Sequence, residues 1–227
     1  MLGTSTPMPG LHGYAAFVFD LDGTLVDSAP DIGDALGAVL REDGRRALSL
    51  DEVRGLIGDG VAVLLQRAWA VTGAPLDPSR LADRVGHFLA SYAAGGHVGT
   101  RPYPGAIEAL RSLRARGVRL AICTNKPIGL THQLLDVLAV ADLFDAVTGG
   151  DSLPVRKPHP DHLLGTLDLL DARPGEAIMI GDSANDVAVA RAAGVAVAVV
   201  PWGYTRTPAA ELGADRVIAS FDELASW

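Results

Sequence analysis

Asp20 follows directly after the apolar run 14–19, and a second aspartate, Asp22, comes two residues later. This run has the length and the aromatic and β-branched content of a buried strand. Carboxylates at the tip of a buried strand are unfavourable unless a positive charge lies beside them. Because ligands bind at the carboxyl ends of the strands in parallel α/β sheets, we expect a metal or phosphate site here. The alternative is a plain acidic turn, since Asp22-Gly23 is a common turn pair.

A second polar string, Thr124-Asn125-Lys126, ends another apolar run. A hydroxyl group and backbone amides in front of a helix can hold phosphate oxygens. An ordinary polar turn between a strand and a helix is the alternative. Lys126 can equally be a surface lysine at the start of the helix.

Lys157 stands in the string Lys-Pro-His-Pro, where two prolines fix the backbone around it. Its ammonium group can neutralise a phosphate oxygen and a nearby carboxylate together, although a single lysine is usually solvated. The chain has seventeen arginines and only two lysines, Lys126 and Lys157. Because arginine supplies most of the positive charge, a retained lysine points to a need for its compact ammonium group.

Asp182 and Asp186 repeat the pattern of the first string, because an apolar run ends in Gly-Asp-Ser and a further aspartate follows four residues later. If a helix starts at Ser183, Asp186 lies in its first turn beside Asp182. The alternative is that Asp182 or Ser183 is an N-cap. Four aspartates that meet a phosphate group cannot all stay ionised without compensation, so we expect a hard divalent cation with oxygen ligands, of the kind that Mg²⁺ prefers.

The elements that must position these side chains form two groups. From about residue 101 the sequence alternates strand and helix patterns, which indicates an α/β fold with a doubly wound parallel sheet covered on both faces. Strands are expected at 14–19, 118–124, 146–148, 177–181, 195–200 and 216–218, and helices at 106–116, 128–138, 161–170, 187–193 and 221–227.

Residues 30–97 contain helical patterns and no convincing strand. Helices are expected at 31–41, 61–71 and 79–94, and Ser49 has the capping-box spacing that starts another. We therefore predict a Rossmann-like core, residues 14–29 and 98–227, with an inserted all-α helical cap, residues 30–97. Residues 101–105, with two prolines and a glycine, look like the linker back to the core, and residues 1–13 look like a flexible N-terminal tail.

Composition excludes several classes of protein. The net charge of −8 and the pI of about 5.1 argue against a nucleic-acid partner, and no apolar run is long enough to span a membrane. The N-terminus lacks the basic start and the apolar stretch of a signal peptide. The single cysteine, Cys123, cannot form an internal disulfide, so we expect a buried inert thiol and a cytoplasmic protein. A chain of 227 residues can work as a monomer or a homodimer.

Taken together and in this order, the four strings resemble the motifs of the haloacid dehalogenase superfamily. The resemblance covers the chain from about residue 14 to its C-terminus, and it implies a role for each motif residue. Asp20 would be the nucleophile, and Asp22 the general acid and base whose backbone carbonyl helps to bind Mg²⁺. The other implied roles are phosphate binding by Thr124 with Asn125 beside it, charge neutralisation by Lys157, direct binding of Mg²⁺ by Asp182, and, for Asp186, binding of Mg²⁺ through water or orientation of Lys157.

Within that superfamily the strings look most like those of bacterial phosphoglycolate phosphatases, which implies 2-phosphoglycolate as the substrate, a small phosphorylated metabolite. Arg54 and Arg67 in the predicted cap are candidates for pairing with its carboxylate. Alternatives are a phosphatase for a sugar phosphate, a nucleotide or pyrophosphate, a hexose-phosphate mutase of the same family, a metal-independent haloacid dehalogenase, and a non-enzymatic sensor or scaffold. The loop 201–204 is expected at the edge of the site, where it would shape the entrance.

Overall fold

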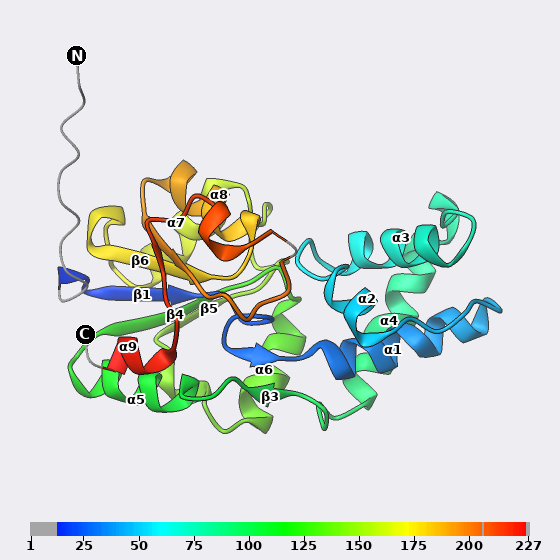
Figure 1. Ribbon diagram of the computed structural model, residues 1–227, viewed down its shortest axis with the longest axis horizontal. Helices are drawn as coiled ribbons and strands as arrows, with labels where there is room; N and C mark the ends of the chain where they lie inside the picture. The colour runs from blue at the N-terminus through cyan, green and yellow to red at the C-terminus, as the bar shows by residue number, and fades with distance from the viewer. Residues whose placement is uncertain (1–12, 206, 226–227) are drawn as a thin grey trace, which may run out of the picture.

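The structure is a computed structural model, and it describes residues 13–205 and 207–225. The predicted tail lies outside the described residues except for Gly13. The main sheet of the protein has six parallel strands in the order β5-β4-β1-β6-β7-β8 (Figure 1). The doubly wound α/β prediction is confirmed. The strands are β1 (Ala16–Phe19), β4 (Arg119–Cys123), β5 (Ala146–Thr148), β6 (Ala177–Gly181), β7 (Ala196–Val199) and β8 (Arg216–Val217).

Strand β1 lies at the centre of the sheet, and its four residues are all buried because helices cover both faces. Phe17 and Phe19 point to the face covered by α5, α6 and α9, whereas Ala16 and Val18 point to the face covered by α7 and α8. This alternation follows from the two-residue period of a strand. The covering helices are α5 (Ala106–Ala115), α6 (Ile128–Val137), α7 (Pro160–Leu169), α8 (Ala184–Ala193) and α9 (Phe221–Ala225).

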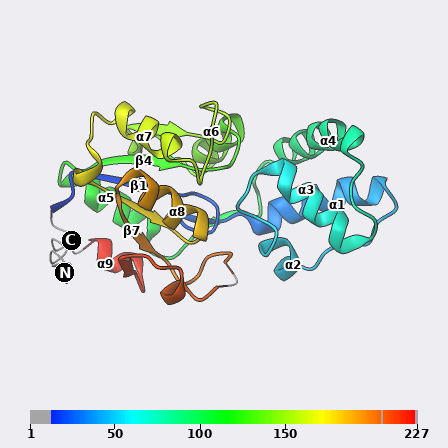
Figure 2. The ribbon, with the colours of Figure 1, turned by 90° about the horizontal axis from the view of Figure 1, so that it is seen from above.

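A four-helix group lies beyond the carboxyl ends of the strands (Figures 1 and 2). It consists of α1 (Ala29–Glu42), α2 (Leu50–Arg54), α3 (Val61–Thr72) and α4 (Leu81–Ala94), the last preceded by a 3₁₀ turn at Pro78–Arg80. Its own apolar core includes Leu36, Leu65, Trp69, Phe88 and Tyr92, separate from the two cores of the sheet. The helical insert is thus confirmed, while the domain boundaries at 29/30 and 97/98 stay predictions.

Most predicted elements differ from the observed ones only at their ends, and the strands at 146–148 and 177–181 match fully. The capping box at Ser49 is confirmed, with the Ser49 hydroxyl accepting from the Glu52 backbone and the Glu52 carboxylate accepting from the Ser49 backbone. Helix α8 starts three residues earlier than expected, directly after Ser183, because the Asp186 carboxylate accepts hydrogen bonds from Ser183 and fixes the first turn.

The description of residues 101–105 as a plain linker is incomplete. Arg101–Pro102 forms strand β3, which pairs antiparallel with β2, Val26–Asp27. The chain leaves the sheet along β2 and returns along β3, so the two connections to the helical group lie side by side. Two-residue strands carry no periodic pattern, and Pro102 argues against a strand, so the sequence could not show this pairing.

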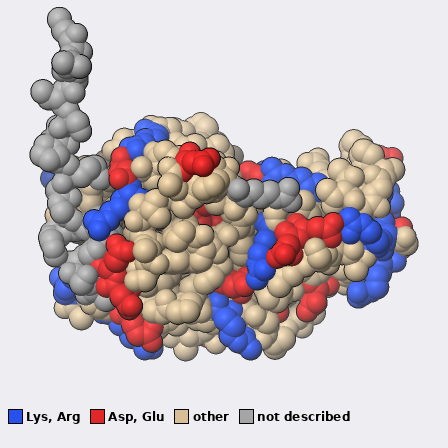
Figure 3. Space-filling view, viewed as in Figure 1, with Lys and Arg blue, Asp and Glu red and all other residues tan. Residues whose placement is uncertain are grey.

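Among the described residues, no helix combines the length and apolar character that crossing a bilayer requires. On the face seen in Figure 3, acidic and basic side chains alternate over the surface, and no broad basic patch lies on it.

Candidate active site

Asp20 leaves the tip of the central strand β1 and meets Lys157, which comes from the loop before α7. The Lys157 ammonium lies 3.0 Å from Asp20 Oδ1 and 2.8 Å from Asp186 Oδ1, and its side chain is 1% exposed. Burial acts to lower the pKa of Lys157, but the charges of Asp186 and Asp20 outweigh it and raise the pKa. Lys157 is therefore a fixed positive charge between two carboxylates.

Backbone contacts fix these two side chains. The Leu21 backbone N–H donates to Asp20 Oδ1 at 2.7 Å. The backbone of Lys157 donates to His162 Nδ1 and accepts from the Asn125 amide at 3.1 Å. Asn125, which follows β4, thus joins the loop of Lys157 to the edge of the sheet, and this contact helps to fix the Lys157 ammonium group.

Asp182 leaves the tip of β6 and faces Asp20. Its carboxylate accepts from the Thr24 hydroxyl at 3.0 Å and from the Tyr204 backbone N–H at 2.8 Å. A Cβ at Gly203 would lie 2.1 Å from the Asp182 Cβ, so only glycine allows the loop of Tyr204 to approach this closely. The loop 201–204 therefore lies at the site, as expected, and helps to fix Asp182.

One carboxylate oxygen from each of Asp20, Asp182 and Asp186 lies within 4.8 Å of the other two. Burial raises the pKa of Asp20 to about 6, although Lys157 opposes this shift. Burial, with the charges of Asp186 and Asp20, raises the pKa of Asp182 to about 8. One lysine does not compensate three buried carboxylates, and a set of carboxylate oxygens suits a hard divalent cation. The cluster therefore fits the predicted metal.

Asp22 faces away from this cluster, towards the helical group. It accepts from the Ser28 hydroxyl at 2.5 Å and from the Lys126 ammonium at 3.1 and 3.2 Å. Lys126 also donates to the Tyr92 hydroxyl of α4 at 2.7 Å, and its side chain is 4% exposed. The interpretation of Lys126 as a surface lysine is therefore wrong. Burial acts to lower its pKa, but Asp22 and Tyr92 outweigh it and raise the pKa to about 12.

Thr124 and Asn125 end strand β4 at the same edge of the sheet. Thr124 is buried and lines a cavity together with Asp20 and Asp22. The amide nitrogen of Asn125 donates to the Gly58 carbonyl at 2.9 Å as well as to the Lys157 backbone. That nitrogen is therefore engaged in joining the loop before α3 to the core, and the phosphate-binding role of Asn125 stays a prediction.

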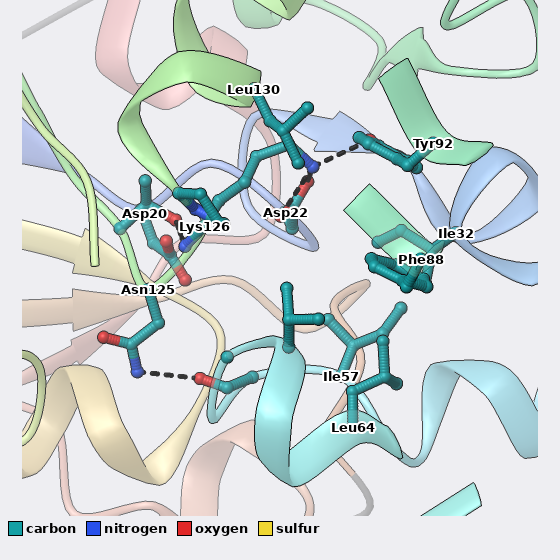
Figure 4. A pocket seen from close by; sticks show the side chains of 15 residues that line it. Asp20, Asp22, Ile32, Ile57, Leu64, Phe88, Tyr92, Asn125, Lys126 and Leu130 are labelled. Carbon is teal, nitrogen blue, oxygen red and sulfur yellow. Dashed lines mark hydrogen bonds and ion pairs between the residues drawn. The ribbon is translucent and has the colours of Figure 1, made fainter. Parts of the chain in front are cut away.

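The cavity beside these residues has a volume of about 60 Å³ (Figure 4). Acidic and basic groups form one side of it, and apolar side chains from the helical group, among them Ile57, Leu64 and Phe88, form the other. A second cavity of about 210 Å³ shares Asp20 and Asp22 and extends to Asp182 and Tyr204. The carboxylates thus stand between two hollows at the junction of sheet and helical group.

The two arginines considered for the substrate carboxylate have other partners. Arg54 lies 2.9 Å from Asp27, and Arg67 lies 2.6 Å from Asp59. Neither lines the two cavities described above. Their assignment to the substrate therefore gains no support from the geometry.

Sequence reasoning assigned no individual role to four side chains that shape the site, although one of them, Tyr204, belongs to the loop expected there. Thr24 and Ser28 belong to the first polar string, so their spacing to the aspartates was a usable signal. Tyr204 donates to Asp27 at 2.8 Å and accepts from the backbone N–H of Ser28 at 2.7 Å. Tyr92 lies on a helix whose apolar pattern predicts only packing, so nothing in the sequence revealed its contact with Lys126.

The chain is similar to known proteins in sequence and in structure. The family model of the haloacid dehalogenase-like hydrolases matches residues 14–194. A phosphoglycolate phosphatase of Rhodospirillum rubrum is 44% identical over 93% of this chain and 90% of its own length, and one of Cereibacter sphaeroides is 45% identical over 96% of both. The crystal structure of a predicted phosphoglycolate phosphatase from Haemophilus somnus superposes with a TM-score of 0.89 at 31% identity, covering 96% of this chain and 99% of that one.

Proposed function

The chain belongs to the haloacid dehalogenase-like hydrolases, and on that premise we propose that it is a magnesium-dependent phosphomonoesterase that hydrolyses 2-phosphoglycolate to glycolate and phosphate. The observation that carries this proposal is the meeting of Asp20, Lys157 and Asp182 at one edge of the sheet. Such a cluster sets a buried carboxylate beside a fixed ammonium group and beside carboxylates that suit a divalent cation, and these are the charges that would stabilise a transferring phosphoryl group.

In the proposed reaction the Asp20 carboxylate attacks phosphorus, and the bond from phosphorus to the alcohol oxygen breaks. Asp22 gives its proton to that oxygen, so the alcohol leaves and an aspartyl-phosphate remains on Asp20. Asp22 then accepts a proton from a water molecule that attacks phosphorus, which releases phosphate and restores Asp20. Asp22 lies beside the cavity and points away from the carboxylate cluster, which supports its role as the general acid and base, with Asp20 as the nucleophile.

Two core residues would hold the transferring group. Lys157, fixed between Asp20 and Asp186, neutralises the charge on the phosphoryl oxygens and on the nucleophile. The Thr124 hydroxyl and the backbone N–H groups that follow β4 bind phosphoryl oxygens at the start of α6. Asp186 acts by orienting Lys157, with which it pairs at 2.8 Å.

The carboxylates of Asp20 and Asp182, with the backbone carbonyl of Asp22, would hold Mg²⁺. When bound, the ion supplies positive charge that screens the approach of one anion to another. The raised pKa values of Asp20 and Asp182 support this assignment, because they reflect buried negative charge that the described side chains do not compensate.

The size of the cavity supports a small substrate. On the measure by which one water needs about 10–15 Å³, a volume of about 60 Å³ has room for roughly four to six water-sized groups. Glycolate fits this size. The names of the relatives point to the same substrate.

The proposal also includes a cytoplasmic location and a monomeric or homodimeric state. The buried free thiol of Cys123 is consistent with a reducing compartment.

The test is phosphate release by the purified protein from 2-phosphoglycolate, glucose 6-phosphate, a nucleoside monophosphate and pyrophosphate, with Mg²⁺ and with EDTA. We expect the highest kcat/KM for 2-phosphoglycolate and loss of activity in EDTA. Activity that is indifferent to EDTA contradicts the metal-dependent mechanism. A higher kcat/KM for another ester contradicts the substrate, and a phosphorylated product in place of free phosphate would indicate a mutase.

A further inference from the structure

Lys126 is the one side-chain cation among the described residues that line the smaller cavity. The phosphoryl site does not require it, because Lys157 supplies the positive charge beside Asp20. Lys126 instead lies on the far side of Asp22, towards α4 (Figure 4). This is the side on which the alcohol part of a substrate must lie if Asp22 protonates it.

The position of Lys126 is fixed before any substrate binds. Its ammonium donates to the Tyr92 hydroxyl at 2.7 Å and stands 4.4 Å from the centre of the Tyr92 ring. Its side chain is 4% exposed, and its carboxylate partner in the structure is Asp22. A lysine held in this way loses little side-chain freedom when a ligand binds, so its charge acts on the ligand at low entropic cost.

The opposite wall of the cavity is apolar and consists of Ile32, Leu64 and Phe88 with their neighbours. A second negative charge on a substrate would be poorly solvated against that wall. Near Lys126, however, it meets a cation in a site of low exposure, where charge-assisted hydrogen bonds are strong. Within the smaller cavity, the charged end of a short alcohol is therefore most favourably placed beside Lys126.

We propose that Lys126, held by Tyr92, is the specificity-determining residue for a carboxylate on the alcohol part of the substrate. The site therefore selects short phosphomonoesters that carry a second anionic group near the phosphate. The inference rests on the proposed phosphatase function and assigns the task first considered for Arg54 and Arg67 to a core residue.

The experiment compares kcat/KM for 2-phosphoglycolate with kcat/KM for 2-hydroxyethyl phosphate, a neutral ester of the same length. The ratio of the two values reports recognition of the carboxylate, whatever happens to the chemistry common to both. We expect the wild-type ratio to be well above one and the Lys126→Met variant to lower it by about 10- to 100-fold, the factor that a charge-assisted hydrogen bond supplies. Circular dichroism and thermal unfolding check that the variant folds.

Two further variants complete the test. Tyr92→Phe keeps the lysine charge but removes the hydroxyl that holds it, so the ratio should fall by a smaller factor, about 3- to 10-fold. This variant decides the matter if Lys126→Met does not fold. Arg156→Met removes an exposed cation whose guanidinium lies within 3.3 Å of the Cβ position of Gly60, just outside the cavity, and the ratio should stay unchanged.

Four results would overturn the proposal. A folded Lys126→Met variant with a ratio within twofold of the wild type shows that Lys126 does not recognise the carboxylate. A fall of the ratio in Arg156→Met as large as the fall in Lys126→Met shows a general effect of charge. A wild-type ratio near one overturns the inference while the phosphatase function stands. If neither ester releases phosphate, the proposed function fails, and this inference fails with it.

Discussion

The strand tips and the helical group build their sides of the site in opposite ways. The tips of β1 and β6 present polar side chains at fixed places, and each carboxylate is held by backbone or side-chain hydrogen bonds. The helical group presents a mainly apolar wall that includes Leu64 and Phe88 and is shaped mostly by packing, with the Tyr92 hydroxyl as a polar contact. A parallel sheet repeats its strand ends at one edge and so can gather charges from distant parts of the chain.

This difference suggests a division of work. The sheet fixes the reaction, because the position of a charge relative to phosphorus must be accurate to within about half an ångström. The helical group fixes the size of the alcohol, for which volume matters more than direction. If so, changes at the tips of β1 and β6 should affect turnover for every substrate, whereas changes in the helical group, or at Lys126 which contacts it, should affect the choice among substrates.

The largest effect is expected from Asp20→Asn. The amide is a poor nucleophile, so kcat should fall by about 10⁴-fold or more for every phosphomonoester, as happens when other enzymes lose their nucleophile. The variant should fold like the wild type, because the Leu21 backbone can still donate to the side-chain oxygen. Steady-state phosphate release with thermal unfolding checks both, and substantial activity would remove Asp20 from the reaction.

Leu64→Ala tests the opposite side. Leu64 is 5% exposed and lines the cavity, so its truncation should lower the free energy of unfolding by about 2–5 kcal/mol. The added space should raise kcat/KM for glucose 6-phosphate relative to 2-phosphoglycolate. Leu113→Ala is the matched control, since Leu113 is buried in the core of the sheet and should lower stability without changing that ratio. If the ratio of kcat/KM for glucose 6-phosphate to that for 2-phosphoglycolate is the same in Leu64→Ala and Leu113→Ala, the helical group does not set the size of the substrate.

The pH dependence of stability follows from the carboxylate cluster. The pKa values of Asp20 and Asp182, about 6 and about 8, lie above the values of an unfolded chain. The stability that these neutral groups contribute is complete at low pH and is lost as the pH rises through about 6 and then about 8. The metal-free protein should therefore become less stable between about pH 4 and about pH 9 through these groups.

Mg²⁺ should reverse this loss, because it binds the ionised carboxylates. At 100 times its Kd it should add about 2.7 kcal/mol to the free energy of unfolding, or about 5–10 °C in Tm. At a fixed concentration of Mg²⁺ the gain should be larger near pH 9 than near pH 6. Differential scanning calorimetry measures it, and Asp182→Asn, which removes one of the proposed ligands, should abolish most of it. A gain that is independent of pH would contradict this assignment of the metal site.

The smallest effect compares two serines at the starts of helices. Ser49→Ala removes the exposed cap of α2, a residue that lines neither cavity, and should lower the free energy of unfolding by about 1 kcal/mol with kcat unchanged. Ser183→Ala removes the hydroxyl that donates to Asp186 at 2.6 Å, and Asp186 in turn holds Lys157. It should therefore lower kcat as well as Tm. An equal loss of kcat in both variants would show that stability alone limits activity.

The tips could be predicted from the sequence because each one joins two local signals, an apolar strand and a polar string directly after it. Asp20 and Asp182 could be placed together on that basis, since parallel strands end at one edge. Lys157 lies in a loop nine residues after β5, and it was singled out by its proline-rich string, by the scarcity of lysine and by the resemblance. The helical group gave no such signal. The contact of Lys126 with Tyr92 joins residues 34 positions apart, and the Tyr92 side chain follows an apolar pattern that predicts only packing. Which acid pairs with Arg54 likewise depends on the crossing of separate elements.

The most direct test of the central claim is the site of the phosphoryl group during turnover. Enzyme mixed with 2-phosphoglycolate and Mg²⁺ is quenched in acid within one turnover, digested, and analysed by mass spectrometry. The proposed mechanism predicts a phosphoryl group on the peptide that contains Asp20, at that carboxylate, and its absence from the Asp20→Asn variant. A phosphoryl group on any other residue, or turnover to free phosphate with no labelled enzyme under conditions that trap the intermediate, would contradict it.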